Sequence, residues 1–236
     1  MTQRRIHFFQ HVPFETPGMI AVWANEKNQG TAYTLFFEKE FLIPPIEHID
    51  WLVVMGGPMS VHDEEKFQWL KIEKEFIRKC IDANKTVIGI CLGSQLVAEA
   101  LGARVFKNTF PEIGIMPVEW TEEAQANFLF NHFPKSQNVF HWHGDTFDLP
   151  ARSIHLAKTN PCRNQAFIFR NNIIGLQFHP EVNDLLIRDM ISGSSEELVN
   201  GKYIQPEEEI LSNEFLLDEN RKLLYTFLDK LSDQSF

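Results

Sequence analysis

Cys91 stands where an apolar run meets a segment with helical spacing. Residues 86–90 are rich in β-branched side chains, and an Ala/Leu-rich segment begins at Leu92. Gly89 and Gly93 flank the cysteine, and such glycines permit the tight strand–turn–helix of a nucleophile elbow, here with sulfur in place of oxygen. A helix N-terminus favours a thiolate over a thiol. This stretch alone favours Cys91 as a nucleophile over Cys91 as a buried core residue. A catalytic thiol also requires a base from elsewhere in the chain.

His179 and Glu181 offer that base and a group to orient it. An apolar strand-like run, residues 173–178, leads directly into His179-Pro180-Glu181. Residues two apart in extended chain point to the same side, so the Glu181 carboxylate can hold the imidazole in one tautomer. Pro180 lacks an N–H and ends the pairing of the strand. Alone, the tripeptide is typical of an incidental strand end, but with Cys91 it supplies nucleophile, base and orienting acid.

The elements that must position these residues alternate between strand and helix up to about residue 105. This alternation predicts a parallel, doubly wound α/β sheet, which binds ligands beyond the carboxyl ends of its strands. Both Gly56-Gly57-Pro58 and Cys91 lie at such ends. The predicted strands are residues 6–12, 32–37, 50–55 and 86–90, and the predicted helices lie within 17–28, 64–84 and 92–101.

After Val105 the pattern changes to short strand-like runs, which we expect as antiparallel strands added to the sheet edge. From Asn183 onward the chain is helical again, and no linker or repeat interrupts it. We therefore expect a single domain, 1–236, in which residues 183–236 are a C-terminal helical extension. The expected late strands are 113–120, 138–142, 154–157, 165–170 and 173–178, and the expected helices are one near 121–130 and a last one at 218–231.

The composition narrows the class of partner. A formal charge of −10 over 236 residues argues against nucleic acid or an anionic membrane as the main partner. Three cysteines at unrelated spacings fit neither a disulfide framework nor a zinc ribbon, which suits a reducing compartment and makes the cytoplasm the expected location. No stretch approaches the roughly 18 apolar residues of a spanning helix.

Three motifs together resemble the class I, or triad-type, glutamine amidotransferases. They are residues 89–95, residues 178–181 and Gly56-Gly57-Pro58, and residues 143–145 and 164–167 fit the same family. The sequence is most similar to stand-alone, GMP-synthase-like members, in which the amidotransferase fold is the whole chain and helices follow the His-Pro-Glu. The resemblance implies a flavodoxin-like fold and release of ammonia from glutamine, with no cofactor.

The resemblance also implies roles for individual residues. Cys91 would attack the side-chain amide of glutamine, His179 would pass the proton to the departing ammonia, and Glu181 would hold His179. Backbone N–H groups of Leu92 and Gly57 would meet the oxyanion, and a glycine loop at a strand end is chemically suited to this because it offers donors at close approach.

Three further residues are expected around the substrate. Gln95 lies one helical turn after Cys91, on the same face, so it can help to hold the glutamyl group. His143 and Asp145 border the glutamine site by resemblance. His141, His143 and Asp145 alternate in extended chain and could present a metal face, but no further ligand is apparent in the sequence, so a pocket wall without metal is the expectation. Cys80 is expected to be structural, and Cys162, in a loop, is expected to take no part in the chemistry.

Three functions remain open at this point. The family usually couples glutamine hydrolysis to a synthetase, yet the sequence has no Gly-x-x-x-x-Gly-Lys-Ser/Thr loop and no Gly-x-Gly-x-x-Gly. Either a separate synthetase partner accepts the ammonia, or the protein acts alone as a γ-glutamyl peptide hydrolase on a small-molecule conjugate. The third alternative is a non-catalytic regulatory or binding protein of the same fold, against which the intact Cys91, His179 and Glu181 speak.

Overall fold

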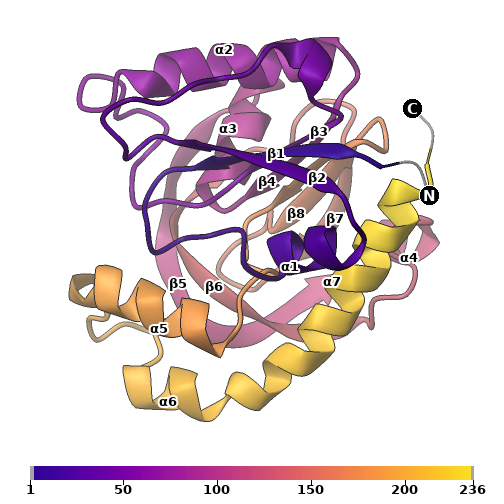
Figure 1. The fold of residues 1–236 in the computed structure, drawn as a ribbon. Coiled ribbons are helices and arrows are strands. Elements are labelled where there is room, and N and C mark those ends of the chain that lie inside the picture. Colours follow the sequence, from indigo (N-terminus) through magenta and orange to yellow (C-terminus); the bar gives the residue numbers. More distant parts are fainter. Residues whose placement is uncertain (1–2, 235–236) are drawn as a thin grey trace.

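A single large sheet forms the centre of the computed structural model, which describes residues 3–234 (Figure 1). The strands are β1 (Arg5–Gln10), β2 (Gly30–Leu35), β3 (Trp51–Val54), β4 (Thr86–Ile90), β5 (Val105–Trp120), β6 (Ser136–Phe147), β7 (Ile154–Lys158), β8 (Ala166–Phe169) and β9 (Ile173–Leu176). Their order across the sheet is β2-β1-β3-β4-β9-β8-β7-β5-β6. Neighbours from β2 to β9 are parallel and neighbours from β9 to β6 are antiparallel. This topology confirms the predicted α/β class, a doubly wound parallel sheet with antiparallel strands added to it.

Helices cover both faces of the parallel half. They are α1 (Gly18–Glu26), α2 (Trp69–Asp82), α3 (Leu92–Ala100), α4 (Glu122–Ala126), α5 (Asp184–Gly193), α6 (Glu207–Ser212) and α7 (Leu217–Ser232), with short 3-10 turns η1 (Ile46–His48), η2 (Ser195–Glu197) and η3 (Glu214–Leu216). Strand β3 shows why both faces need a cover, because all four of its side chains are buried and alternate between two apolar clusters. Leu52 packs with α2 and α3, whereas Trp51 packs with α1 and α7.

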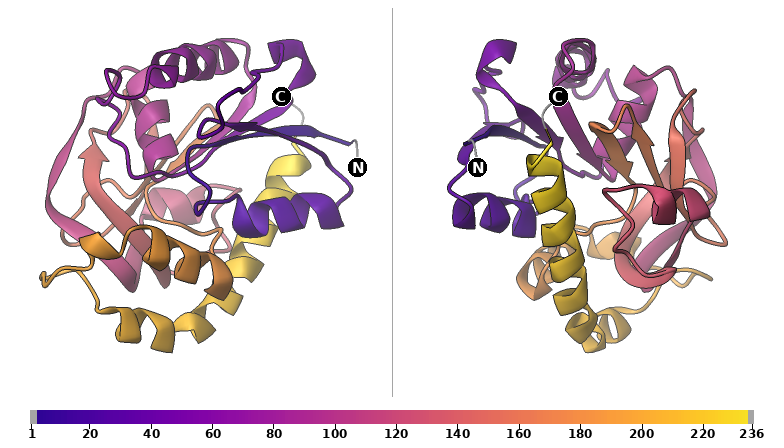
Figure 2. Two further views of the ribbon diagram at one scale, coloured as in Figure 1. Left: turned by 60° about the vertical axis from the view of Figure 1, so that its left-hand side comes forward. Right: turned by 90° about the vertical axis from the view of Figure 1, so that its right-hand side faces the viewer.

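The last helix, α7, belongs to the core around the sheet rather than to a separate layer. Figure 2 shows it in yellow beside α1. The indole of Trp23 donates to Asp229 Oδ1 at 2.9 Å, Lys27 Nζ lies 2.7 Å from the same oxygen, and Phe227 shares the apolar cluster of Trp23. The predicted extension 183–236 thus contains α5, α6 and α7, and its residues 235–236 lie outside the described part. That the extension and the rest of the chain form one domain stays a prediction.

Strand β9 differs from its expected place. Residues 173–178 were expected among antiparallel strands at the sheet edge, but β9 lies in the middle, parallel to β4 and antiparallel to β8. All four of its residues are buried, as is typical of a central strand. Because parallel neighbours end at the same edge of a sheet, the chain leaves β9 toward His179 beside the point where it leaves β4 toward Cys91.

Other expected elements also differ in length, and β5, expected at residues 113–120, already begins at Val105. Strand β6 runs from Ser136 to Phe147 instead of ending at residue 142, so His141, His143 and Asp145 all lie on it, paired with β5. Helix α4 ends at Ala126, well before residue 130, although Thr121 caps its start by accepting from the Ala124 N–H at 3.1 Å. Among the described residues, no helix is both long and apolar enough to cross a bilayer.

Candidate active site

The backbone at Cys91 forms a strained elbow. Cys91 has φ +50° and ψ −110°, outside the regions that a non-glycine residue adopts cheaply. A Cβ added to Gly89 would strike the carbonyl oxygen of Gly93, and a Cβ added to Gly93 would strike that of Val54. Backbone atoms cannot move aside as side chains do, so both glycines are needed for the close approach of α3 to β4 and β3. The elbow places Cys91 at the carboxyl end of β4, directly before the first residue of α3.

His179 and Glu181 form a buried pair at the same edge. The imidazole Nδ1 lies 2.8 Å from Glu181 Oε1, and each residue is only 1% exposed. The backbone N–H of His179 donates to the carbonyl of Phe140 at 2.8 Å and fixes the position of the residue. Within residues 3–234, Nε2 of His179 has no hydrogen-bond partner. This nitrogen is therefore free to exchange a proton with a neighbouring group.

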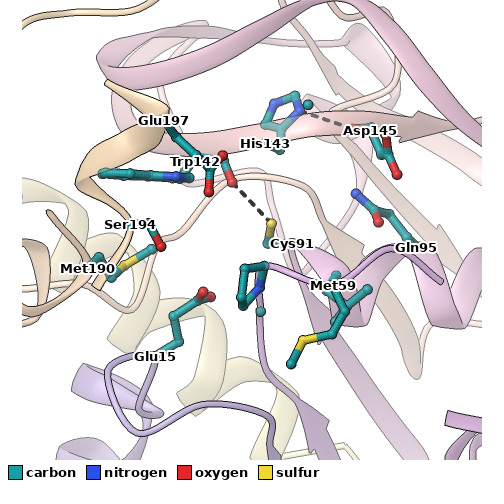
Figure 3. A pocket seen from close by; sticks show the side chains of 14 residues that line it. Glu15, Met59, Cys91, Gln95, Trp142, His143, Asp145, Met190, Ser194 and Glu197 are labelled. Atoms are coloured by element: carbon teal, nitrogen blue, oxygen red, sulfur yellow. Dashed lines mark hydrogen bonds between the residues drawn. The ribbon is translucent and has the colours of Figure 1, made fainter. Parts of the chain in front are cut away.

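Cys91 is that neighbour. A Cβ built on Gly56 would lie 3.0 Å from His179 Cε1 and 3.4 Å from Cys91 Cβ, so both side chains meet over this glycine. Burial raises the pKa of the Cys91 thiol, and the nearby His179 partly opposes the rise. Burial lowers the pKa of His179, but the Glu181 carboxylate and the thiol outweigh it and raise that pKa well above its ordinary value. In this structure the thiol donates to the carbonyl of Trp142 at 3.3 Å (Figure 3).

A cavity of about 140 Å³ opens beside the thiol (Figure 3). The residues expected around the oxyanion and the substrate all line it: Gly57, Leu92, Gln95, His143 and Asp145. His179 and Glu181 do not line the cavity and lie behind it.

The backbone N–H groups of Gly57 and Leu92 are suited to hold an oxyanion. Leu92 is the first residue of α3, whose first N–H groups have no partner within the helix. Its N–H bonds to the Cys91 sulfur, which lowers the pKa of the thiol. The two residues adjoin, because a Cβ added to Gly57 would lie 3.3 Å from Leu92 Cδ2. Both residues line the cavity beside Cys91.

A histidine that the sequence analysis missed supports this loop. His11 Nδ1 lies 2.8 Å from the carbonyl oxygen of Gly56, and His11 Nε2 lies 2.8 Å from Glu73 Oε1 of α2. Burial lowers the pKa of His11, but the charge of Glu73 more than offsets this, so the pKa is raised overall. An imidazole that donates through both nitrogens joins α2 to the Gly56-Gly57 loop. The sequence did contain one indication that His11 lies near the site, because it stands at the carboxyl end of a predicted parallel strand.

Side-chain contacts hold Gln95 and Asp145, which line the cavity. Gln95 Nε2 donates to Gln177 Oε1 at 3.2 Å, and Ser60 Oγ donates to Asp145 Oδ2 at 3.1 Å. His143 Nδ1 lies 3.1 Å from the carbonyl oxygen of Asp145. These contacts give this side of the cavity polar groups in defined positions.

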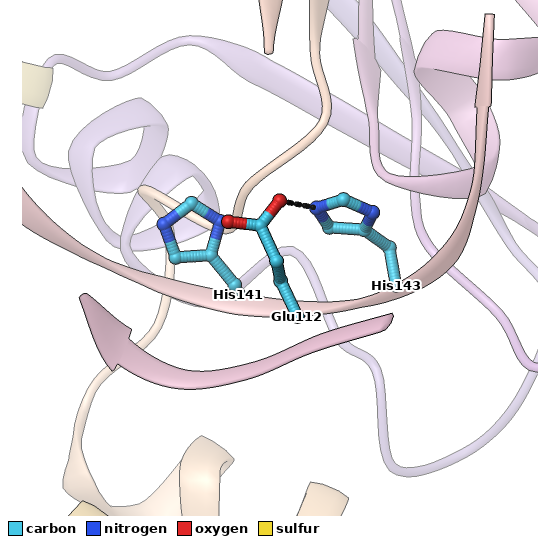
Figure 4. A group of neighbouring side chains, drawn as sticks. All are labelled: Glu112, His141 and His143. Carbon is cyan, nitrogen blue, oxygen red and sulfur yellow. Dashed lines mark ion pairs between the residues drawn. The ribbon is translucent and has the colours of Figure 1, made fainter. Parts of the chain in front are cut away.

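Glu112, His141 and His143 form a buried cluster behind that wall (Figure 4). One ligand atom from each lies within 4.8 Å of the others, and two histidines with a carboxylate are a donor set that suits a transition metal. Glu112 is the additional ligand that the sequence analysis did not find, because it comes from β5 and reaches β6 only through sheet pairing. Burial lowers the pKa of His141 to about 4.

The amide of Gln165 contacts two of the three members of this cluster. Its Nε2 is 2.7 Å from Glu112 Oε2 and 3.4 Å from His143 Nε2, and Thr159 Oγ1 also donates to Glu112 Oε2, at 3.0 Å. An amide donor at this point satisfies the carboxylate and competes with a cation. Glu112 Oε2 lies 3.3 Å from His143 Nε2, and His143 lines the cavity. A wall without metal stays a prediction.

Four residues on the remaining side of the cavity were also missed. Glu15 follows β1, and the other three come from the C-terminal helical segment: Met190, Ser194 and Glu197. Glu15 follows a predicted parallel strand, and this place in the sequence indicates that it could lie near the site. Nothing in the local sequence of α5 and η2 shows that they close the cavity, because that depends on how the segment folds back over the sheet edge.

Comparison with known proteins agrees with this geometry. The family model described as "Glutamine amidotransferase class-I" matches residues 25–185. The glutamine amidotransferase-like protein YfeJ of Salmonella typhimurium is 32% identical over 234 residues, 97% of each chain. One of the subunits of the glutamine-hydrolyzing GMP synthase of Picrophilus torridus is 35% identical over 137 residues, which are 57% of this chain and 69% of that one. A crystal structure of a glutamine amidotransferase from Thermotoga maritima superposes with a TM-score of 0.89 at 33% identity and covers 99% of this chain and 100% of its own.

Proposed function

Because the chain belongs to the class I glutamine amidotransferase family, we propose that it hydrolyses the γ-amide of glutamine or of a γ-glutamyl conjugate through a thioester on Cys91. The observation that carries the proposal is the meeting of Cys91 and His179 over Gly56, with Glu181 bonded to the far side of the imidazole. This arrangement has the nucleophile, the base and the orienting acid that thiol-dependent acyl transfer requires.

The first half-reaction forms the thioester. His179 Nε2 takes the proton of the Cys91 thiol as Sγ attacks the γ-carbonyl carbon. The N–H groups of Gly57 and Leu92 stabilise the resulting oxyanion, and loss of one such donor typically costs roughly 100-fold in rate. His179 then gives the proton to the amide nitrogen, the C–N bond breaks, and ammonia or an amine departs.

The second half-reaction regenerates the enzyme. Water, deprotonated by His179, attacks the thioester, the C–S bond breaks, and the sulfur recovers its proton from the imidazolium. The products are glutamate and the amine. Throughout, the negative charge of Glu181 stabilises the imidazolium and keeps its Nε2 directed at the sulfur. Gln95, His143 and Asp145 hold the glutamyl group on the opposite wall.

The fate of the amine distinguishes two versions of the proposal. The Picrophilus relative is named as one of the subunits of a GMP synthase, which supports a version in which a separate synthetase chain accepts ammonia from this protein. In the other version the protein hydrolyses a γ-glutamyl conjugate alone. Turnover of glutamine and of γ-glutamyl peptides by the purified chain separates them, because strong activity on conjugates with none on glutamine would contradict the first.

Release of glutamate by purified protein tests the function common to both versions. We expect release from at least one γ-glutamyl substrate by the wild type and by Cys162→Ala, and none above background by Cys91→Ala, with equal circular dichroism spectra for all three. Full activity in Cys91→Ala would contradict the proposed nucleophile. Inactivity of the wild type on every γ-glutamyl substrate would favour a binding or regulatory protein of the same fold.

A further inference from the structure

The cavity has two chemically different sides, separated by Cys91. Figure 3 shows Gln95 and Asp145 on one side of the thiol and Glu15, Met190 and Ser194 on the other. The proposed function uses only the first side, where amide and carboxylate groups are held by neighbouring side chains. The second side carries a buried carboxylate and a buried hydroxyl, and the exposed Glu197 stands at the mouth.

Glu15 is a buried carboxylate without a hydrogen-bond donor. It is 7% exposed and lines the cavity, and in the described part of the chain no N–H or O–H donates to it. Burial raises its pKa to about 7, against the opposing effect of His179. A buried carboxylate that lacks donors is costly to keep. Such a group, aimed into a cavity, is complementary to a donor or a positive charge supplied by a ligand.

Glu15 lies where the departing amine is expected, and not where the glutamyl group is expected. A Cβ on Gly56 would strike Glu15 Oε2 and would lie 3.0 Å from His179 Cε1, so carboxylate and imidazole lie side by side over this glycine. The amide nitrogen must face His179 at the moment of C–N cleavage, because His179 supplies its proton. Whatever is attached to that nitrogen then extends on the His179 side of the sulfur, where Glu15 stands.

The charges on this side discriminate between kinds of leaving group. Besides Glu15 it offers the hydroxyl of Ser194 and the carboxylate of Glu197, and the described part of the cavity lining contains no lysine or arginine. A leaving amine that bears a carboxylate, as every amino acid does, meets like charge here. An amine that bears a second ammonium group meets opposite charge in a desolvated site, where such contacts are strong.

Resting on the proposed function, we infer that Glu15, with Ser194 and Glu197, forms a subsite for the departing amine that selects γ-glutamyl conjugates of cationic amines, such as diamines, over γ-glutamyl amino acids. The reaction is hydrolysis: the C–N bond of the conjugate is replaced by the C–S bond of the thioester, and water replaces that bond in turn. Its products are glutamate and a diamine. Glu15 acts by binding the charged end of the amine and takes no part in bond making.

Three conjugates of similar size test the inference by charge alone. They are γ-glutamyl-(2-aminoethyl)amide, which is cationic at its far end, γ-glutamyl ethylamide, which is neutral, and γ-glutamylglycine, which is anionic. We expect kcat/KM of the wild type to fall in that order, by about tenfold or more between the cationic and the neutral conjugate. Equal values, or a preference for the glycine conjugate, would overturn the inference.

Substitution of Glu15 assigns the selectivity to this residue. In Glu15→Gln the ratio of kcat/KM between the cationic and the neutral conjugate should fall toward one, whereas Glu196→Gln, the same change at an exposed neighbour of Glu197, should keep the wild-type ratio. The ratio is taken within one variant, so a general loss of activity cancels. An equal loss on all three conjugates would show that Glu15 holds the α-ammonium of the glutamyl group, and would overturn the inference.

Hydrolysis of glutamine, measured with the wild type and with Cys91→Ala, shows whether a failure concerns this inference or the proposed function. Cys91-dependent hydrolysis of glutamine, with none of any conjugate, would overturn the amine subsite and leave the proposed function intact. Absence of Cys91-dependent hydrolysis of glutamine and of all three conjugates would overturn both.

Discussion

The imidazole Nδ1 of His179 lies 2.8 Å from Glu181 Oε1, in a pair that is almost wholly buried. Because the other ring nitrogen has no partner among the described residues, the pair presents one nitrogen to the sulfur of Cys91 and keeps the other occupied. Under the proposed mechanism the electrostatic state of this pair governs proton transfer at the thiol, and a single substitution alters it.

Glu181→Gln should shift the pH dependence as well as the rate. The Glu181 carboxylate is the strongest of the effects that raise the pKa of His179 against burial, so its removal lowers that pKa. Because His179 must be neutral to accept the thiol proton, we expect the acid limb of kcat/KM to move to lower pH, with a rate loss of about 100-fold or more. Glu181→Asp, which retains the charge, should keep the limb closer to its original pH. An unshifted profile in Glu181→Gln would show that the pair does not set the proton affinity.

A glutamine-analogue electrophile should label Cys91 and neither of the other cysteines. Cys80 and Cys162 are both buried, at 0% and 1% exposure, and burial raises their pKa values to about 12 and about 11. Thiols of this kind are poor nucleophiles at neutral pH. Peptide mass spectrometry after treatment with 6-diazo-5-oxo-norleucine identifies the labelled residue, and modification of Cys80 or Cys162 in the folded protein would contradict the assignment.

Glu73→Gln should destabilise the protein and slow the reaction together. It breaks the buried contact with His11, which holds the carbonyl of Gly56, and loss of one partner of such a pair costs about 3–5 kcal/mol. Because the pKa of His11 is raised in the folded state, the contribution is complete below about pH 6.5 and declines at higher pH. Urea unfolding at pH 6 measures it.

The control for this change lies on the same helix. Glu75 pairs with Lys79 at an exposed site on α2, so Glu75→Gln should change neither the unfolding midpoint nor the rate measurably. Equal behaviour of the two variants would mean that the contact between His11 and Glu73 is unimportant for the Gly56-Gly57 loop.

Glu15→Gln should increase stability at alkaline pH relative to acid pH. The folded-state pKa of Glu15 is raised from 4.5 to about 7, so its stabilising contribution is present below pH 4.5 and is lost as the pH rises through 7. Gln does not titrate and has no such loss. The unfolding free energy of the variant relative to wild type should therefore increase by up to about 3 kcal/mol between pH 4.5 and 8. The facing groups His179, Glu181, His11 and Glu197 are the same in both proteins. A constant difference in unfolding free energy would contradict the prediction.

Gly93→Ala should prevent the elbow from forming. The added Cβ would strike the carbonyl of Val54, which is part of the sheet and cannot move without breaking strand pairing, so we expect a loss of about 3 kcal/mol or more in unfolding free energy. The matched control is Gly30→Ala, whose added Cβ would have its nearest contact at 3.6 Å. Similar unfolding midpoints for the two variants would show that the backbone at the elbow can adapt.

Local chemistry explains why the elbow and the pair were predictable. Gly89 and Gly93 around a cysteine indicate a tight turn, and residues two apart in extended chain share a side, so Cys91, His179 and Glu181 could be chosen from short stretches of sequence. The parallel half of the sheet followed from the alternation of strands and helices. All of these inferences depend on interactions within a few residues of one another.

Long-range pairing decided what could not be predicted. The place of β9 beside β4 depends on which strands meet in the sheet, and no periodicity within residues 173–178 contains that information. Glu112 reaches His143 only because β5 and β6 pair in one register.

By itself, the sequence therefore determined the class of sheet and singled out Cys91, His179 and Glu181 as the candidate nucleophile, base and orienting acid, because each inference depends on residue type and local spacing. Only the tertiary structure decided how the cavity is completed. Glu15 and His11 after β1, and Ser194 and Glu197 after α5, come together because separate segments pack at one sheet edge. The physical reason is that their proximity is set by the packing of apolar faces elsewhere in the chain, which the polar residues themselves do not encode.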